Sequence, residues 1–162
     1  MAGTSSSACG LGGETCQSCG PVLACFSDGA CGLDELRVWR VQPVSATIAG
    51  DNSGRYWDPD ASPPDVFATL GCPGEDDDTG GQTEVVESYT PSWSTGGCFA
   101  TAQDLLDRGF GVQLWDQDAF GDESITGEIS VQGLVEGHFT AGYMDVQASG
   151  GMLTLRIALQ PQ

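Results

Sequence analysis

Residues 114–131 read LWDQDAFGDESITGEISV and gather carboxylates in a short space. Asp116 and Asp118 follow Trp115, and Asp122 and Glu123 come shortly after them. Neighbouring negative charges disfavour one another's ionised form unless a positive charge lies between them. The chain has only five Lys and Arg among 162 residues, so a side chain is a poor candidate for that charge. The pattern therefore indicates a bound cation.

Strands are the elements that must position these carboxylates. Several short runs alternate apolar and polar residues and are separated by Gly, Pro, Asp and Ser, as is typical of a β-sandwich. The runs are 36–48, 65–70, 83–89, 110–116, 125–134 and 151–159. One short helix is expected within a connection, over 101–108. We predict an all-β fold, an antiparallel sandwich of about eight strands.

The charge excludes several classes of partner. A formal net charge of −18 opposes binding to nucleic acid, whose phosphates need a basic surface, and direct docking on anionic lipid. It favours cations. No pairing of a nucleophile with a base, and no phosphate-binding Gly loop, can be argued from the residues. We therefore expect a protein that is not an enzyme.

Cysteines mark a separate N-terminal segment. Five of the seven lie within the first 31 residues: Cys9, Cys16, Cys19, Cys25 and Cys31. This segment has few large apolar residues, so we expect disulfides to hold it together. A structural zinc site that uses four of the thiols is the alternative, and Cys16-x-x-Cys19 lacks the βαβ context of a redox motif.

Disulfides imply an oxidising compartment, so we expect a secreted or cell-surface protein. The segment resembles the short Cys- and Gly-rich repeats of large secreted myxobacterial proteins. We divide the chain into a disulfide-stapled segment, 1–33, and a sandwich, 34–162.

Three stretches, taken in order, resemble the C2 domain, a calcium-dependent β-sandwich. DVFA at 65–68 is similar to the family's Asp-Pro-Tyr-Val strand, and TPSW at 90–93 to its Asn-Pro-x-Trp turn. WDQD at 115–118, followed by Gly127, is similar to the family's Trp-Asp-x-Asp loop. The resemblance covers about residues 35–162, and WDPDASPPD looks most like bacterial extracellular members.

The resemblance implies a Ca²⁺ site, because C2 loops bring carboxylates together at one end of the sandwich. Asp58 and Asp65 correspond to the ligands of the first loop, and Asp116 and Asp118 to those of the third. The family's last Asp falls on Ser124 here, beside Asp122 and Glu123. We expect Asp122 to replace it, with Glu123 and Ser124 as alternatives, and binding to be weaker. Asp51 and Asp60 are interpreted as turn residues that bond their own backbone.

The C2 resemblance also bears on lipid binding and on the positions of the last two cysteines. Many lipid-binding members carry a lysine cluster in and after the turn that follows the Asp-Pro-Tyr-Val strand. This chain has the acidic sequence GCPGEDDDTGGQ there, at 71–82. Only Phe120 is an apolar candidate for membrane insertion. Cys72 and Cys98 are expected at opposite ends of the sandwich, too far apart for a disulfide, which needs Cα atoms within about 7 Å.

We therefore expect an extracellular Ca²⁺-binding module, part of a larger surface or secreted protein or assembly. Its partner is expected to be a protein or glycan, including a second copy of the chain. One alternative is a Ca²⁺-dependent membrane-binding module in which ions bridge the loops to phospholipid. The other is a targeting domain of a secreted enzyme that this chain does not contain.

Overall fold

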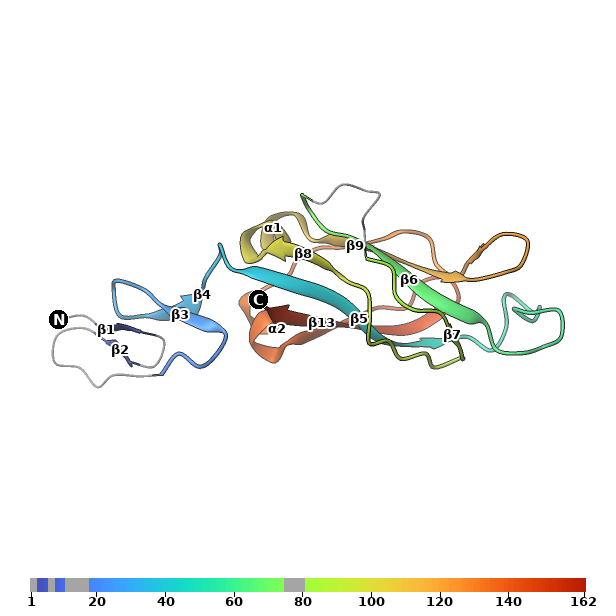
Figure 1. Ribbon diagram of the computed structural model, residues 1–162, viewed down its shortest axis with the longest axis horizontal. Coiled ribbons are helices and arrows are strands. Elements are labelled where there is room, and N and C mark those ends of the chain that lie inside the picture. The colour runs from blue at the N-terminus through green and yellow to red at the C-terminus, as the bar shows by residue number, and fades with distance from the viewer. Residues whose placement is uncertain (1–2, 6–7, 11–17, 75–80) are drawn as a thin grey trace.

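Two antiparallel sheets form the body of the molecule (Figure 1). The computed structural model describes residues 3–5, 8–10, 18–74 and 81–162. The first sheet has the order β10 (Glu123–Ser124), β9 (Phe110–Asp116), β6 (Asp65–Gly71), β7 (Val86–Glu87), and β11 (Ile129–Val131) also pairs with β9. The second has the order β12 (Tyr143–Val146), β13 (Met152–Pro161), β5 (Val38–Ile48), β8 (Cys98–Thr101).

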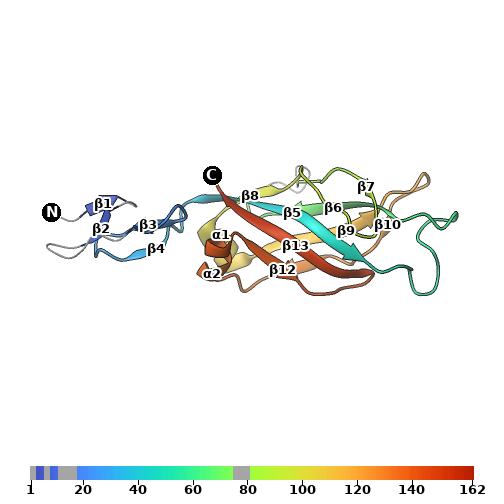
Figure 2. The same cartoon turned by 90° about the horizontal axis from the view of Figure 1, so that it is seen from below.

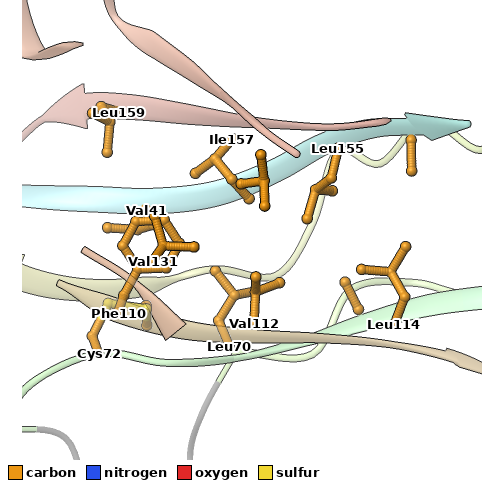
Figure 3. Close-up of a cluster of buried hydrophobic side chains, with 14 of the residues drawn as sticks. Val41, Leu70, Cys72, Phe110, Val112, Leu114, Val131, Leu155, Ile157 and Leu159 are labelled. Atoms are coloured by element: carbon orange, nitrogen blue, oxygen red, sulfur yellow. A yellow bond between two sulfur atoms is a disulfide. The ribbon is translucent and has the colours of Figure 1, made fainter. Parts of the chain in front are cut away.

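The core lies between the two sheets, and residue alternation explains it. Every second residue of β9, beginning at Phe110, is buried. Because side chains alternate between the faces of a strand, these residues point to one side. Figure 3 shows Val112 and Leu114 of β9 facing Leu155 and Ile157 of β13 across the sandwich. The predicted all-β antiparallel sandwich is confirmed.

Individual elements follow the sequence prediction where the pattern is long. The runs at 36–48, 65–70, 110–116 and 151–159 form β5, β6, β9 and β13. The runs at 83–89 and 125–134 are largely irregular and contribute only β7 and β11. The sequence analysis missed β8, β10, β12 and the helix α2 (Glu136–Ala141), because elements this short carry too few residues for a period to be recognised.

The expected short helix is present as α1 (Ala102–Arg108). The Thr101 hydroxyl caps it by accepting a hydrogen bond from the Asp104 amide, at 3.1 Å. Gly109 ends the helix with a φ of 70°, a conformation that other residues rarely adopt. Within the described residues, no helix has the length and apolar character needed to cross a membrane.

All four tryptophans pack against other residues of the sandwich. Trp39, Trp57 and Trp93 are buried in the core. Trp115 stacks on Phe67 on the outer face of the first sheet, with ring centroids 6.5 Å apart. The tryptophans therefore stabilise the sandwich.

The N-terminal segment extends from one end of the sandwich (Figures 1 and 2). It contains two small hairpins, β1 (Gly3–Ser5) with β2 (Ala8–Gly10) and β3 (Leu23–Cys25) with β4 (Cys31–Leu33). The side chain of Leu33 is buried in the sandwich core, and its amide donates to Glu136 at 3.4 Å. These contacts connect the segment to the sandwich at α2.

Disulfides are present in this segment, as the scarcity of apolar residues predicted. Cys19 and Cys31 are bonded, with Cα atoms 5.3 Å apart, and Cys25 is also disulfide-bonded. Cys19, Cys25 and Cys31 are therefore not free thiols that could bind zinc. Cys16 and the acids at 75–78 lie outside the described residues.

The expected separation of Cys72 and Cys98 was wrong, because the two form a disulfide with Cα atoms 5.7 Å apart. The prediction placed a turn before Cys98, at the far end of the sandwich. The chain instead continues beside β5: the Ile48 amide donates to Tyr89 and the Trp93 amide donates to Val44. Cys98 consequently lies level with Val41, further along β5, and there it reaches Cys72.

Candidate metal centre

The loops that carry the acidic residues project from the end of the sandwich opposite the N-terminal segment (Figures 1 and 2). One loop, 49–64, follows β5, and the other, 117–122, follows β9. β6 and β9 are antiparallel neighbours, with Val66 opposite Asp116. The beginning of β6 therefore lies beside the end of β9. Asp65 and Asp116, 51 positions apart in sequence, are brought into contact in this way.

Asp116 is the central residue of this end. Its side chain is fully buried, because residue 116 is on the core face of β9. Oδ1 accepts a hydrogen bond from the Asp65 amide at 2.7 Å. Oδ2 is buried and has no hydrogen-bond partner in the part of the chain that the structure describes. A buried carboxylate oxygen without a donor is costly, so this atom needs a ligand or a proton.

The pKa of Asp116 is raised to about 6, mainly by burial. The hydrogen bond from the Asp65 amide lowers the pKa, and the charges of Asp58, Asp118 and Asp65 raise it. The pKa of Asp65 is also raised, first by burial and then by Asp58 and Asp118. Each of these shifts has the sign expected for carboxylates that repel one another. Asp58, Asp65, Asp116 and Asp118, four of the five predicted ligands, therefore lie at one end of the sandwich, where their charges act on Asp65 and Asp116. Their role as ligands stays a prediction.

The fifth predicted ligand, Asp122, does not belong to this coupled set. It is exposed and is not among the charges that raise the pKa of Asp65 or Asp116. Its neighbour Glu123 lies opposite Asp116 in the sheet, and Glu123 Oε1 accepts from Asn52 Nδ2 at 2.8 Å. This bond joins the first loop to β10, directly after the second loop. The sequence analysis did not single out Asn52, since nothing in its surroundings indicates a partner 71 positions away.

Ser124, the residue at the family's usual ligand position, is occupied elsewhere. It lies opposite Trp115, the outward-facing neighbour of Asp116 on β9. Its hydroxyl accepts from Gln113 Nε2 at 3.0 Å and donates to the Thr126 carbonyl. Because adjacent residues of a strand face opposite sides, Ser124 is on the sheet face away from Asp116.

The remaining acids of the first loop bond their own turns, as expected. Asp51 accepts from the Gly54 amide at 2.6 Å. Asp60 accepts from the amide and hydroxyl of Ser62, and these bonds lower its pKa. Such contacts fix the path of the loop on either side of Asp58.

Two aromatic side chains are exposed on the same loops. Phe120 follows Asp118 and is fully exposed, at 104% of its reference area. Tyr56 precedes Asp58 and is 67% exposed. Large apolar side chains at this level of exposure mark possible contact points when they gather at one end of a molecule.

A cation fits the chemistry of this end, although a closed site is not formed. Among residues 18–74 and 81–162, no three His, Cys, Asp or Glu side chains are close enough together to make a ready metal group. Asp116 Oδ2 is nevertheless a buried carboxylate oxygen without a described partner, and Asp58 and Asp118 nearby lie on loops. All the available donors are oxygens, which suits a hard cation such as Ca²⁺ with its flexible coordination.

No protein-family model matches the sequence, and no curated protein matches it. Among solved structures, the chain is similar to the C2A domain of a plant extended synaptotagmin 1, with a TM-score of 0.50 and 14% identity over 79% of this chain and 97% of that one. A structure described as that of a C2 domain gives a TM-score of 0.48 and 16% identity, over 76% and 98%. The calcium-bound C2A and C2B domains of extended synaptotagmin 2 give 0.48 and 15%, over 77% and 46%.

Identities this low establish the fold alone. The chain is a C2-like β-sandwich, as the three sequence motifs predicted.

Proposed function

We propose that this C2-like sandwich is an extracellular Ca²⁺-binding module in which the ion controls a contact with another molecule. Asp58, Asp65, Asp116 and Asp118 would hold the ion. The observation that carries the proposal is the buried Oδ2 of Asp116, which has no partner among the described residues, beside the negative charges of Asp58, Asp65 and Asp118 that raise the pKa of Asp116.

Two hydrogen bonds order the carboxylate end before any ion binds. The Asp65 amide orients the Asp116 carboxylate, and the bond from Asn52 to Glu123 joins the first loop to β10. A bound divalent cation would supply positive charge next to these carboxylates, none of which forms an ion pair with an Arg in the described residues. Neutralising the carboxylates removes the repulsion that would otherwise spread the loops and exposes a fixed surface to a partner.

The disulfides support a location outside the cytosol. Cys19–Cys31 and Cys72–Cys98 would be reduced in most cytosolic compartments. We assign the module to a larger secreted or cell-surface protein or assembly, with a protein or glycan partner, including another copy of the chain. The assignment is a binding role rather than an enzymatic one.

Calcium binding is tested by thermal melting and titration calorimetry of the full chain with Ca²⁺, Mg²⁺ or a chelator. At a free concentration near 100 times Kd, Ca²⁺ should stabilise the folded state by about 2.7 kcal/mol. The Asp58→Asn and Asp118→Asn variants should each weaken this effect, and Asp107→Asn, on α1 at the other end, should not. Identical melting curves with millimolar Ca²⁺ and with chelator would refute the proposal.

A Ca²⁺-dependent contact with a membrane is the second candidate, and the exposure of Phe120 and Tyr56 favours it. Both side chains lie on loops next to the carboxylates, where bound ions could bridge to lipid phosphates. Co-flotation with phosphatidylserine vesicles in Ca²⁺, abolished by Phe120→Ala and Tyr56→Ala together, would support this candidate. Leu36→Ala is the matched control, since Leu36 is 75% exposed near the N-terminal segment. Absence of Ca²⁺-dependent flotation would exclude it.

A further inference from the structure

The outer face of the second sheet contains a hollow of about 560 Å³. Leu155 and Ile157 of β13 point into the core, so Thr154, which precedes Leu155, and Arg156, which lies between the two, point outward. Their cross-strand neighbours on β5, Thr47 and Ser45, are on the same face. The hollow therefore lies on the side of β13 and β5 that faces away from the first sheet.

Five of the eleven residues that line the hollow carry hydroxyl groups. We call this surface the hydroxyl hollow and define its hydroxyls as those of Ser45, Thr47, Thr90, Ser92 and Thr154. The Ser45–Ser92 bridge extends the row of residues beyond β5 to the segment before β8. Five hydroxyls on adjacent strands thus form one polar platform.

These hydroxyls remain available for a ligand. Elsewhere, the hydroxyls of Ser62, Thr83, Ser94, Thr101 and Thr126 bond to other protein groups. In the described part of the chain, none of the five hydroxyls in the hollow has such a bond. Each can both donate and accept a hydrogen bond.

One ion pair forms the edge of the hollow and is held rigidly. Arg156 Nε and Nη2 donate to the two carboxylate oxygens of Asp145 at 2.7 and 2.9 Å. The guanidinium also lies over the ring of Tyr143, 4.4 Å from its centroid. These contacts use Nε and Nη2, so Nη1 retains its N–H groups for another acceptor.

The charge of the hydroxyl hollow distinguishes it from the rest of the surface. Among the residues that the structure describes, Arg156 and Asp145 are the only ionisable ones in its lining, and their charges cancel. The chain as a whole carries −18. A neutral lining rich in hydroxyls provides no attraction for a phosphate or a metal ion, but it offers many donors and acceptors to a ligand that is itself uncharged and polar.

We infer that the hydroxyl hollow binds a neutral glycan. Sugar hydroxyls match a lining that can donate and accept at many points, and the Arg156–Asp145 pair offers adjacent donor and acceptor groups to neighbouring sugar hydroxyls. Leu153, which is 51% exposed at the hollow, can cover the apolar C–H face of a sugar ring. The volume falls in the range of small-molecule sites, roughly 300 to 1,000 Å³.

The test is binding of the full chain to arrays of neutral glucans, mannans and galactans, with polygalacturonate and heparin as acidic contrasts. Calorimetry with the best neutral oligosaccharide follows, at millimolar concentrations. Two variants remove the proposed contacts: Arg156→Gln, and Thr47→Val with Thr154→Val, which suit a β-strand. Arg108→Gln is the matched control, because Arg108 also faces an Asp, at 3.9 Å, but on α1.

We expect affinity for a neutral glycan that falls about tenfold in both hollow variants, or about 1.4 kcal/mol. Affinity should be unchanged in Arg108→Gln and in the presence of chelator. The hydroxyl hollow shares no residue with the carboxylate end, so chelator separates this inference from the calcium proposal.

Three outcomes would overturn the inference: no binding to any neutral glycan, stronger binding to the acidic polysaccharides, or equal affinity in the hollow variants. Sedimentation provides a further check. A dimer that is lost in the Thr47→Val, Thr154→Val variant would identify this face as a contact between two copies, and would also overturn it.

Discussion

Replacing Asp116 by Asn is expected to have opposite effects with and without calcium. Asn keeps the size of the side chain, and its Oδ1 can still accept from the Asp65 amide. Its Nδ2 takes the place of the buried oxygen that has no described partner, and the side chain no longer adds a negative charge to those of Asp58, Asp65 and Asp118. Without calcium the Asp116→Asn variant should therefore be more stable than the wild type at neutral pH.

The size of the effect follows from the pKa. A value of about 6 in the folded state, against an ordinary value of about 4, corresponds to about 3 kcal/mol when fully expressed. Asn leaves a buried N–H group without a described partner, which offsets part of this gain, so we expect about 1 to 2 kcal/mol. For a chain of this length, that raises the melting midpoint by several degrees.

The pH dependence of stability in chelator shows at which pH the Asp116→Asn variant is more stable than the wild type. Because the pKa of Asp116 is raised on folding, its contribution to stability is fully present below the unfolded-state value near pH 4, and is lost as pH rises through about 6. In chelator, the wild type and the Asp116→Asn variant should have similar stability at pH 4 and diverge by pH 7. With calcium the order should reverse, since only the wild type gains the stabilisation by the ion.

Thermal and urea unfolding from pH 4 to pH 7 measures the stability of the wild type and of the Asp116→Asn variant, each with chelator and with calcium. Asp107→Asn, on α1, makes the same charge change away from the loops and should behave like the wild type. The reasoning is refuted if the Asp116→Asn variant is less stable than the wild type in chelator, or if calcium stabilises both proteins equally.

Two further predictions concern the sandwich itself. Glu84 accepts hydrogen bonds from Ser94 and Thr95, mainly through the Thr95 hydroxyl, and its pKa is lowered to about 2. Glu84→Gln should therefore lower the free energy of unfolding by about 1 kcal/mol at pH 7, after solvent screening. The difference should disappear as pH falls from about 4.5 towards 2. Equal melting midpoints of the two proteins at pH 7 would contradict this. Replacing both Cys72 and Cys98 by Ala should lower the free energy of unfolding by about 2 to 4 kcal/mol, measured by urea denaturation with reduced wild type as the comparison, and an unchanged midpoint would show that the disulfide does not constrain the sheets.

Long alternating segments could be predicted from sequence because their period is repeated many times. β5, β9 and β13 each bury one face, and the apolar residues that do so are adjacent in the printed pattern. Short elements such as β8 and β12 do not repeat the pattern often enough. They depend on hydrogen bonds to β5 and β13, which come from distant parts of the sequence.

The candidate site was predicted in part, for a related reason. Asp65 begins β6 and Asp116 ends β9, so these two strands fix the positions of the carboxylates. Asp122 lies in the loop between strands, where a shift of one or two residues changes which side chain faces inward. Its role stays a prediction, and the structure places Glu123, rather than Ser124, opposite Asp116.

The sequence alone determined the all-β class, the acidic character of the loop end and the need for covalent links in the N-terminal segment, because these depend on composition and local period. Only the tertiary structure decided which distant residues meet. It brought Cys98 beside Cys72, because residues 89–93 continue along β5, and it left Asp116 Oδ2 without a described partner. It also assembled five hydroxyls from separate strands into one hollow. Contacts of this kind arise from strand pairing and from the packing of one sheet on the other, and neither is encoded within a single stretch of the chain.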